Sequence, residues 1–198
     1  MSLLLYLDTE STGLDPKTCG ATQISGIIVR GGKEISRLDI NVNPYSYHRE
    51  VTISPKALEV TRKSIKEIKG YPSATVGFYK LTSWLNAHRD LGEYFTLICY
   101  RTSYDLGILE ELFKDQKGNS RGLYDFIQFK TLDILESTKL CSLIGVHKLK
   151  NEKLTTVCEY YNVPLIAHDS LEDIVASRKV YKKMLIAMGV AERKLKVI

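Results

Sequence analysis

The chain has 198 residues, of which 44% are hydrophobic and 26% are charged, a composition typical of a folded protein in water. No apolar run approaches the roughly 20 residues that a membrane span needs, and residues 1–7 lack the basic start of a signal peptide, so we expect one domain over residues 1–198 in the cytoplasm. The formal net charge of +5 mildly favours binding to polyanionic partners and excludes no class of function by itself.

The hydrophobic pattern predicts strands first, followed by strands and helices in alternation. An apolar run predicts a strand at 3–7, and two β-branched runs around Gly31-Gly32-Lys33 predict a hairpin over 24–30 and 35–42. Helical patterns lie within 55–69 and at 73–88, 104–114, 153–161 and 171–188, with a strand at 95–100, a loop at 118–122, and residues 129–134 fitting either a last strand or a strand that runs into a helix. This order predicts an α/β fold, a mixed sheet with its first three strands antiparallel and with helices flanking it.

The spacing of the cysteines and the clusters of basic residues indicate little about function. The four cysteines are widely separated and form no C-x-x-C pair, which argues against a zinc knuckle and a redox motif. Basic residues cluster at 62–69, 148–153 and 179–183, and we interpret each run as a solvated helix face. These runs gain meaning only if a phosphate-processing site is found on other grounds.

Two carboxylates follow the first apolar run with one residue between them. In a strand, Asp8 and Glu10 share one face while Thr9 points to the other. Their repulsion and burial would raise the pKa of both groups unless a positive charge lies between them, and a divalent metal ion is the simplest such charge. The alternative is that Asp8 and Thr9 only begin a turn, because Asp, Ser, Thr and Gly are common in loops.

A third acid lies at the start of a predicted helix. Asp105 stands three residues before Ile108 and heads the apolar stripe of the 104–114 helix, so it faces the core or a cleft. The alternative is a stabilising acid in the first helical turn, where the helix dipole favours negative charge.

A fourth acid and a histidine lie at the start of the last helix. The capping-box-like spacing of Asp169 and Glu172 predicts a helix start there, with His168 just before it. Asp173 then falls on a largely apolar face of the helix. That face continues through Ser177, Val180, Met184 and Ala187. The opposite, charged face runs through Glu172, Lys179 and Lys183. The alternative for His168 is a loop histidine with no role.

Four inward-facing acids at the ends of separate elements favour a metal site. Carboxylate oxygens suit two hard cations such as Mg²⁺ or Mn²⁺, and two ions roughly 4 Å apart form the clamp used for displacement at phosphorus. A loop histidine beside such a clamp can take a proton from the attacking water.

The order and spacing of these motifs resemble the DnaQ-like 3′–5′ exonucleases, in the branch with four acids and a histidine. The matching segments are Asp8-Thr-Glu10-Ser-Thr-Gly-Leu14, Tyr104-Asp105 and His168-x-x-x-x-Asp173, with weaker similarity at Gln23-Ile-Ser-Gly26, Ser54-Pro-Lys-Ala and residues 154–161. The resemblance spans roughly residues 3–188. It implies a ribonuclease H-like fold and metal-dependent removal of nucleoside 5′-monophosphates from a 3′ end.

The resemblance also implies roles for individual residues. Asp8 would bridge two metal ions, Glu10 and Asp173 would hold the first ion, Asp105 would hold the second through water, and His168 would be the general base. The terminal nucleotide would be lined by Thr9, Thr12, Gly13 and Leu14, with Leu14 packed against its base. Where the family has H-N-x-x-F-D, this chain has Tyr100-Arg101-Thr-Ser-Tyr104-Asp105. Arg101 then either contacts phosphate in place of the family asparagine or is a surface arginine.

Three functions are consistent with these motifs. The leading hypothesis is a 3′–5′ exonuclease acting on the 3′ end of single-stranded DNA. The alternatives are a 3′–5′ exoribonuclease or oligoribonuclease-like scavenger, and a non-catalytic module that binds nucleic acid or a polymerase. A DNA polymerase is a candidate partner, although the chain ends at Ile198, shortly after the last helix, which favours a free-standing nuclease.

Overall fold

A mixed sheet forms the centre of the molecule. The computed structural model describes residues 2–166 and 169–190. Within them, five strands pair in the order β3-β2-β1-β4-β5; they are β1 (Leu3–Ser11), β2 (Ala21–Arg30), β3 (Lys33–Asn41), β4 (Thr96–Cys99) and β5 (Leu132–Asp133). β1 to β3 are antiparallel neighbours, whereas β4 runs parallel to β1 and β5 runs parallel to β4. The predicted mixed sheet with an antiparallel first part is confirmed.

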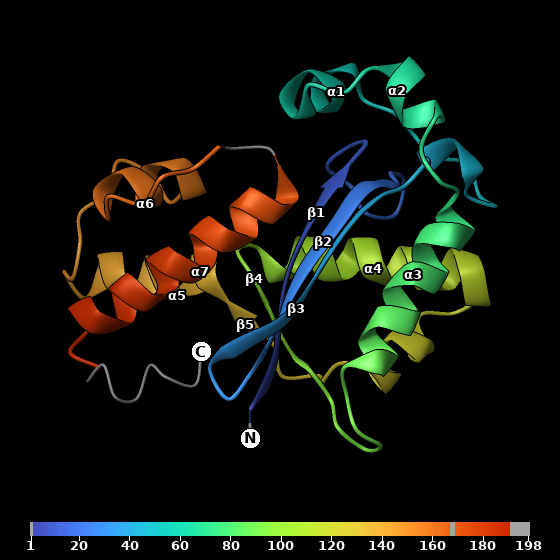
Figure 1. Cartoon of the computed structure of the whole chain (residues 1–198). Coiled ribbons are helices and arrows are strands. Elements are labelled where there is room, and N and C mark those ends of the chain that lie inside the picture. Colours follow the sequence, from blue (N-terminus) through green and yellow to red (C-terminus); the bar gives the residue numbers. More distant parts are fainter. Residues whose placement is uncertain (1, 167–168, 191–198) are drawn as a thin grey trace.

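Helices cover both faces of this sheet (Figure 1). The α3 and α4 helices lie on one face and α5, α6 and α7 on the other, while α1 and α2 lie beyond the end of β1. Their bounds are α1 (Pro55–Thr61), α2 (Ile65–Lys69), α3 (Ala74–Ala87), α4 (Thr102–Lys117), α5 (Ile134–Leu143), α6 (Leu154–Tyr160) and α7 (Ser170–Ala187), with short 3₁₀ turns at Pro44–Ser46 and Arg121–Asp125. Among these helices, none combines the length and the apolar character that crossing a bilayer requires.

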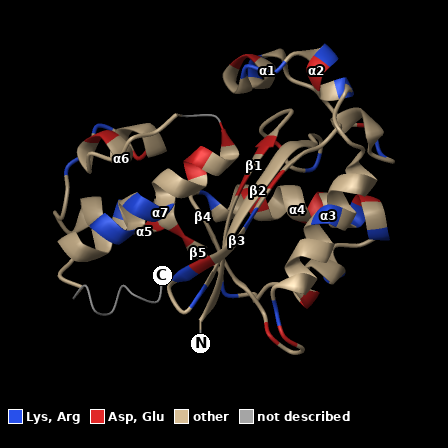
Figure 2. Cartoon of the chain, viewed as in Figure 1, with Lys and Arg blue, Asp and Glu red and all other residues tan. Residues whose placement is uncertain are grey.

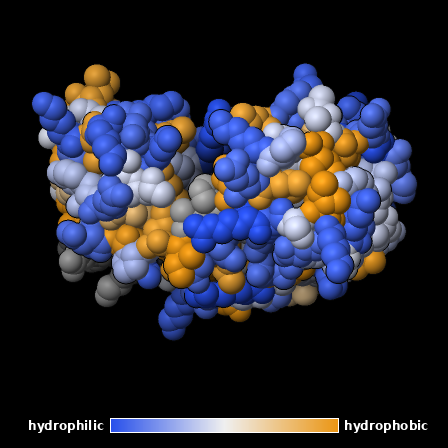
Figure 3. Space-filling model, turned by 90° about the horizontal axis from the view of Figure 1, so that it is seen from above, coloured by the Kyte–Doolittle hydropathy of each residue, from blue (hydrophilic) through white to orange (hydrophobic). Residues whose placement is uncertain are grey.

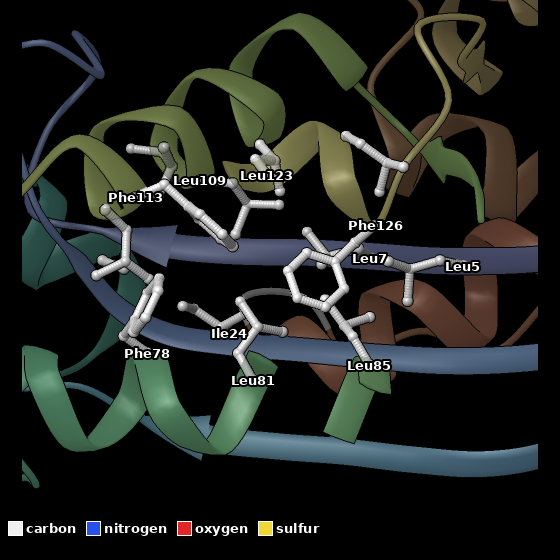
Figure 4. Close-up of a cluster of buried hydrophobic side chains, with 14 of the residues drawn as sticks. Leu5, Leu7, Ile24, Phe78, Leu81, Leu85, Leu109, Phe113, Leu123 and Phe126 are labelled. Carbon is white, nitrogen blue, oxygen red and sulfur yellow. The ribbon is translucent and has the colours of Figure 1, made fainter. Parts of the chain in front are cut away.

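The alternation of β1 side chains divides the interior into two cores. Leu5 and Leu7 point into the core under α3 and α4, where Phe78 and Phe113 meet edge to face with ring centroids 4.9 Å apart (Figure 4). Tyr6 points the other way, into the core under α5, α6 and α7. Because successive strand residues alternate between faces, residues 8–11 must continue the same two rows.

The region after β4 decides between two forms that the sequence left open. Residues 129–134 were predicted as a strand or as a strand that runs into a helix, and the second form is present, since β5 has two residues and α5 follows it directly. Asp133 begins α5 by accepting a hydrogen bond from the Glu136 backbone N–H at 3.2 Å. The same side chain accepts the Thr102 N–H at 2.9 Å, so one carboxylate joins the starts of α4 and α5.

Candidate active site at the end of strand β1

The two acids of β1 lie on the face that α7 covers. Asp8 and Glu10 continue the row of Leu4 and Tyr6, and both are partly buried. They lie inside the strand, because β1 continues to Ser11, and not in a turn after it. The alternative in which Asp8 merely begins a turn is therefore excluded.

The α7 helix brings a third acid to this pair. Asp169 caps the helix by accepting the backbone N–H groups of Leu171 at 3.1 Å and Glu172 at 3.2 Å, as its position predicted. Asp173 follows in the first turn, and carboxylate oxygens of Asp8, Glu10 and Asp173 lie within 4.8 Å of one another. Figure 2 shows acidic residues at the end of β1 and at the start of α7.

The faces of α7 follow the predicted pattern with one correction. Ser177, Val180 and Met184 are buried, whereas Glu172, Lys179 and Lys183 are exposed, as their helical positions predicted. Ala187 was predicted on the buried face and is exposed. It is the last residue of the helix, three positions after Met184, the last buried residue of α7.

Asp105 lies beside this cluster and not within it. It is in the first turn of α4 and is 3% exposed, so the prediction that it faces inward is confirmed. Its Oδ1 accepts the backbone N–H of Thr9 at 3.0 Å and the Thr9 hydroxyl at 2.8 Å. Thr9 is on the opposite face of β1 from Asp8 and Glu10, which explains why Asp105 approaches the strand from the α4 side.

Burial and mutual repulsion raise the pKa values of these acids. Burial raises the pKa of Asp8 well above its usual range, and the charges of Asp105, Asp173 and Glu10 raise it further. Burial also raises the pKa of Glu10 to about 7, against the opposing effect of the Lys63 charge. The pKa of Asp105 rises to about 7 through burial, although its hydrogen bonds from Thr9 act in the opposite direction.

These residues fit a hard divalent cation. The three clustered groups offer only oxygen ligands, which suit Mg²⁺ or Mn²⁺. Burial raises the pKa values of Asp8 and Glu10, and the charges of neighbouring acids raise them further. A bound divalent ion would supply the missing positive charge.

The pH dependence of stability tests this electrostatic arrangement. In the unfolded chain, Glu10 and Asp105 release their protons near pH 4, whereas in the folded protein they do so near pH 7. The folded state therefore binds more protons between these values, and the free energy of unfolding falls as the pH rises through this window. For Glu10 alone, the raised pKa corresponds to a loss of roughly 3 kcal/mol.

We expect urea unfolding in EDTA to show lower stability at pH 8 than at pH 5. Adding Mn²⁺ at pH 8 should restore stability, because the ion binds the ionised acids of the folded state. Equal or greater stability at pH 8 in EDTA would contradict the arrangement.

A cavity of about 280 Å³ adjoins the acids. Glu10 lies in its wall, Leu14 is 88% exposed beside it, and α1 contributes apolar residues such as Val60. The remaining lining residues are Thr9, Ser11, Gly13, Ser54, Lys56, Ala57, Thr61, Arg101 and Tyr104. Seen from above in Figure 3, the surface is largely hydrophilic, with separate hydrophobic patches.

The turn after β1 is held on both sides. The Thr12 side chain is fully buried, donates to the Thr52 carbonyl oxygen at 2.7 Å and accepts the Gly20 N–H at 3.0 Å. Thr12 therefore supports the turn and does not line the cavity, unlike the other predicted nucleotide-contacting residues. On the other side, the Tyr104 hydroxyl donates to the Gly13 carbonyl oxygen at 2.5 Å.

Arg101 is exposed at the mouth of the cavity, directly before α4. Its guanidinium forms no hydrogen bond or ion pair with residues 2–166 or 169–190. His168, the predicted base, lies outside the described residues. Sequence reasoning missed the link between Tyr104 and Gly13 and the half-buried position of Lys63, which belongs to a basic run interpreted as solvated.

Comparisons with known proteins identify the family of this chain. A protein-family model described as an exonuclease (RNase T) matches residues 5–181. The chain is 24% identical over 185 residues to a PolC-type DNA polymerase III of Bacillus cereus; the match covers 91% of this chain but only 11% of the polymerase.

Solved structures of exonuclease I share the fold. Exonuclease I from Methylocaldum szegediense superimposes with a TM-score of 0.77 at 15% identity, over 99% of this chain and 42% of that one. Exonuclease I of E. coli in complex with a 5cy-dA13 oligonucleotide gives a TM-score of 0.76 at 15% identity, with the same coverage. The chain thus spans less than half the length of these structures and has the predicted ribonuclease H-like fold. Because the family model covers most of its length, the chain belongs to the DnaQ-like 3′–5′ exonuclease family.

Proposed function

We propose that the chain is a metal-dependent 3′–5′ exonuclease that hydrolyses single-stranded DNA to nucleoside 5′-monophosphates. The observation that carries this proposal is the cluster of Asp8, Glu10 and Asp173, in which Glu10 also lines a cavity with an exposed leucine beside it. The cavity of about 280 Å³ is close to the lower limit of the range for small-molecule sites, and the terminal nucleotide would occupy it. The similar exonuclease I structure with bound dA13 supports a DNA strand as the substrate.

The acids would hold two divalent ions. Asp8, Glu10 and Asp173 would hold one ion, and Asp8 together with Asp105, acting through water, would hold the second. Bound ions would supply a Lewis acid that polarises the scissile phosphate and lowers the pKa of the attacking water.

Residues of the chain would position the strand and move the proton. Leu14 would pack against the terminal base, Thr9 and Gly13 would contact the terminal nucleotide, and Arg101 would pair with phosphate. His168 would accept the proton of the attacking water. Its predicted position, directly before the helix that carries Asp173, supports this role.

The turn that carries Leu14 offers a specific test. Replacing Tyr104 by Phe keeps the ring that the family has here and removes one of two hydroxyls that donate to the Gly13 carbonyl oxygen; Ser11 supplies the other at 2.8 Å. A hydrogen bond of about 1 kcal/mol corresponds to roughly a fivefold change in binding, so we expect KM for a single strand to rise severalfold with little change in kcat. Tyr79→Phe, on an exposed residue of α3, is the control. An unchanged KM for Tyr104→Phe would show that the hydroxyl does not position the turn.

An RNA substrate is the second candidate. RNA differs from DNA by its 2′-hydroxyl, and the resemblance to a DNA polymerase domain favours DNA. Digestion of matched DNA and RNA strands, with Mn²⁺ and with EDTA, should release nucleoside monophosphates faster from DNA and only with metal. Faster release from RNA would replace the DNA assignment with an exoribonuclease. Tight binding of strands without any release would support the non-catalytic module. The PolC-type relative also keeps a polymerase as a candidate partner.

A further inference from the structure

A lysine outside the predicted motifs lies beside the acid cluster. Lys63 follows α1, where Arg62 ends the helix in the left-handed conformation (φ 56°). The Lys63 backbone N–H then donates to the Leu58 carbonyl oxygen at 3.0 Å. This tight turn directs the Lys63 side chain back towards the sheet, and Lys63 is half-buried while its neighbours Arg62 and Ser64 are exposed.

The sheet register places the Lys63 ammonium next to Glu10. Gln23 is the direct cross-strand partner of Glu10, so the two side chains share one face with their Cβ atoms about 5 Å apart. Lys63 Nζ donates to Gln23 Oε1 at 3.0 Å. Gln23 Nε2 donates to Asp39 Oδ1 at 2.9 Å, which fixes the orientation of the amide, and Gln23 is 5% exposed.

The Lys63 ammonium retains hydrogen-bonding capacity in this position. An ammonium has three donors, and Gln23 takes one of them. Lys63 forms no ion pair with any residue in the described ranges, Glu10 included. Yet its charge has the largest electrostatic effect on Glu10, and burial lowers the pKa of Lys63 itself. The structure thus keeps a partly desolvated cation near Glu10 without a contact ion pair between them.

Two other cations line the cavity beside Glu10, whereas Lys63 lies outside its lining residues. Lys56 lies on α1 and Arg101 lies before α4, and both are exposed. A polyanionic strand must approach a site with several acids, and cations around that site offset the repulsion. Lys63 differs from the other two because Gln23 already holds its ammonium in place, so less side-chain entropy is lost when it binds an anion.

We propose that Lys63 is a substrate-binding residue whose ammonium contacts a phosphate oxygen of the strand that enters the cavity. This inference rests on the proposed function. It assigns to Lys63 a contact with the strand backbone, which is independent of base sequence.

Strand binding without hydrolysis tests this contact. The wild type, Lys63→Gln and Lys66→Gln are titrated into a labelled single-stranded DNA in EDTA at several salt concentrations. Lys66 lies three residues further on, on the exposed surface of α2, and matches the change in net charge. We expect Lys63→Gln to weaken binding and to reduce the slope of log K against log salt by about 0.7, the value for one phosphate contact on a single strand. Lys66→Gln should behave as the wild type.

A double variant separates phosphate contact from simple neutralisation of Glu10. If Lys63 only offsets the Glu10 charge, the double variant Lys63→Gln/Glu10→Gln should bind the strand as tightly as Glu10→Gln alone. If Lys63 contacts phosphate, the double variant should bind more weakly than Glu10→Gln by the same factor as Lys63→Gln relative to the wild type. Lys63→Arg should retain most of the salt dependence.

The outcomes distinguish this inference from the proposed function. A wild type that degrades the strand, together with a Lys63→Gln variant that has the wild-type slope, overturns the Lys63 assignment alone. Restoration of binding in the double variant to that of Glu10→Gln also overturns it. A wild type that neither binds nor degrades the strand overturns both.

Discussion

Replacing Asp8 by Asn is expected to abolish metal-dependent strand hydrolysis. Asp8 lies in the cluster with Glu10 and Asp173, and charges on both sides of β1 converge on it. Loss of a metal ligand removes several kcal/mol of transition-state stabilisation, so we expect kcat to fall by about 10³-fold or more. Asn has nearly the same shape as Asp, so the substitution removes the charge without changing the packing. The fall in kcat is measured as the release of mononucleotides from a labelled strand in Mn²⁺.

The same variant should be more stable than the wild type when metal is absent. Burial first, and then repulsion by the neighbouring acids, raises the pKa of Asp8. Asn removes the ionisable group that both effects penalise, so the urea midpoint in EDTA at pH 8 should rise. It should also lose most of the stabilisation that Mn²⁺ gives the wild type. Glu172→Gln, on the exposed face next to Asp173, should change neither property. An active Asp8→Asn enzyme would remove Asp8 from the metal site.

Replacing His168 by Ala is expected to lower kcat by about 10²–10⁴-fold at neutral pH, the usual contribution of a general base. The pH profile identifies the cause. The wild-type rate should rise with pH through an ionisation near the ordinary histidine pKa of about 6.5, and the variant should lose that ionisation. The binding of the strand in EDTA should change little.

His48 provides the matched control. It is an exposed histidine beside Asp115, away from the acid cluster, and His48→Ala should retain both the rate and the pH profile. If His168→Ala kept the wild-type rate and profile, another group would have to be the base.

Sequence patterns anticipated the acid cluster because it depends on local rules. Strand alternation placed Asp8 and Glu10 on one face, and helical spacing placed Asp173 on a face that Val180 and Met184 bury. These periodicities are properties of a few consecutive residues. The convergence of the two elements was inferred from the shared anomaly of acids on apolar faces, and the structure confirms it.

Other parts of the site depend on contacts that no local pattern contains. The bond between Asp105 and Thr9 joins residues 96 apart and requires knowing which face of β1 meets α4. The position of Lys63 depends on the register of β1 with β2, which brings Gln23 opposite Glu10. The basic run at 62–69 did not indicate the half-buried position of Lys63, because the other basic residues of the run are exposed, as predicted.

In the fold, too, some elements follow from local sequence patterns and others depend on contacts between distant residues. The β1–β3 meander follows from alternation and from the Gly31-Gly32 turn, where both glycines have positive φ. β5 is a two-residue strand whose identity rests on parallel pairing with β4, a contact about 30 residues away along the chain. The apolar character of residues 129–134 could not separate it from the start of α5.

The release of label from single-stranded DNA labelled at its 3′ end or at its 5′ end tests the polarity and the metal site together. With the wild type in Mn²⁺, a labelled mononucleotide should be released immediately from the 3′-labelled strand. The 5′-labelled strand should shorten one nucleotide at a time, and neither reaction should occur in EDTA or with Asp8→Asn. Release that is unchanged by EDTA, or that begins at the 5′ end, would contradict the claim that these acids form the metal site of a 3′–5′ exonuclease.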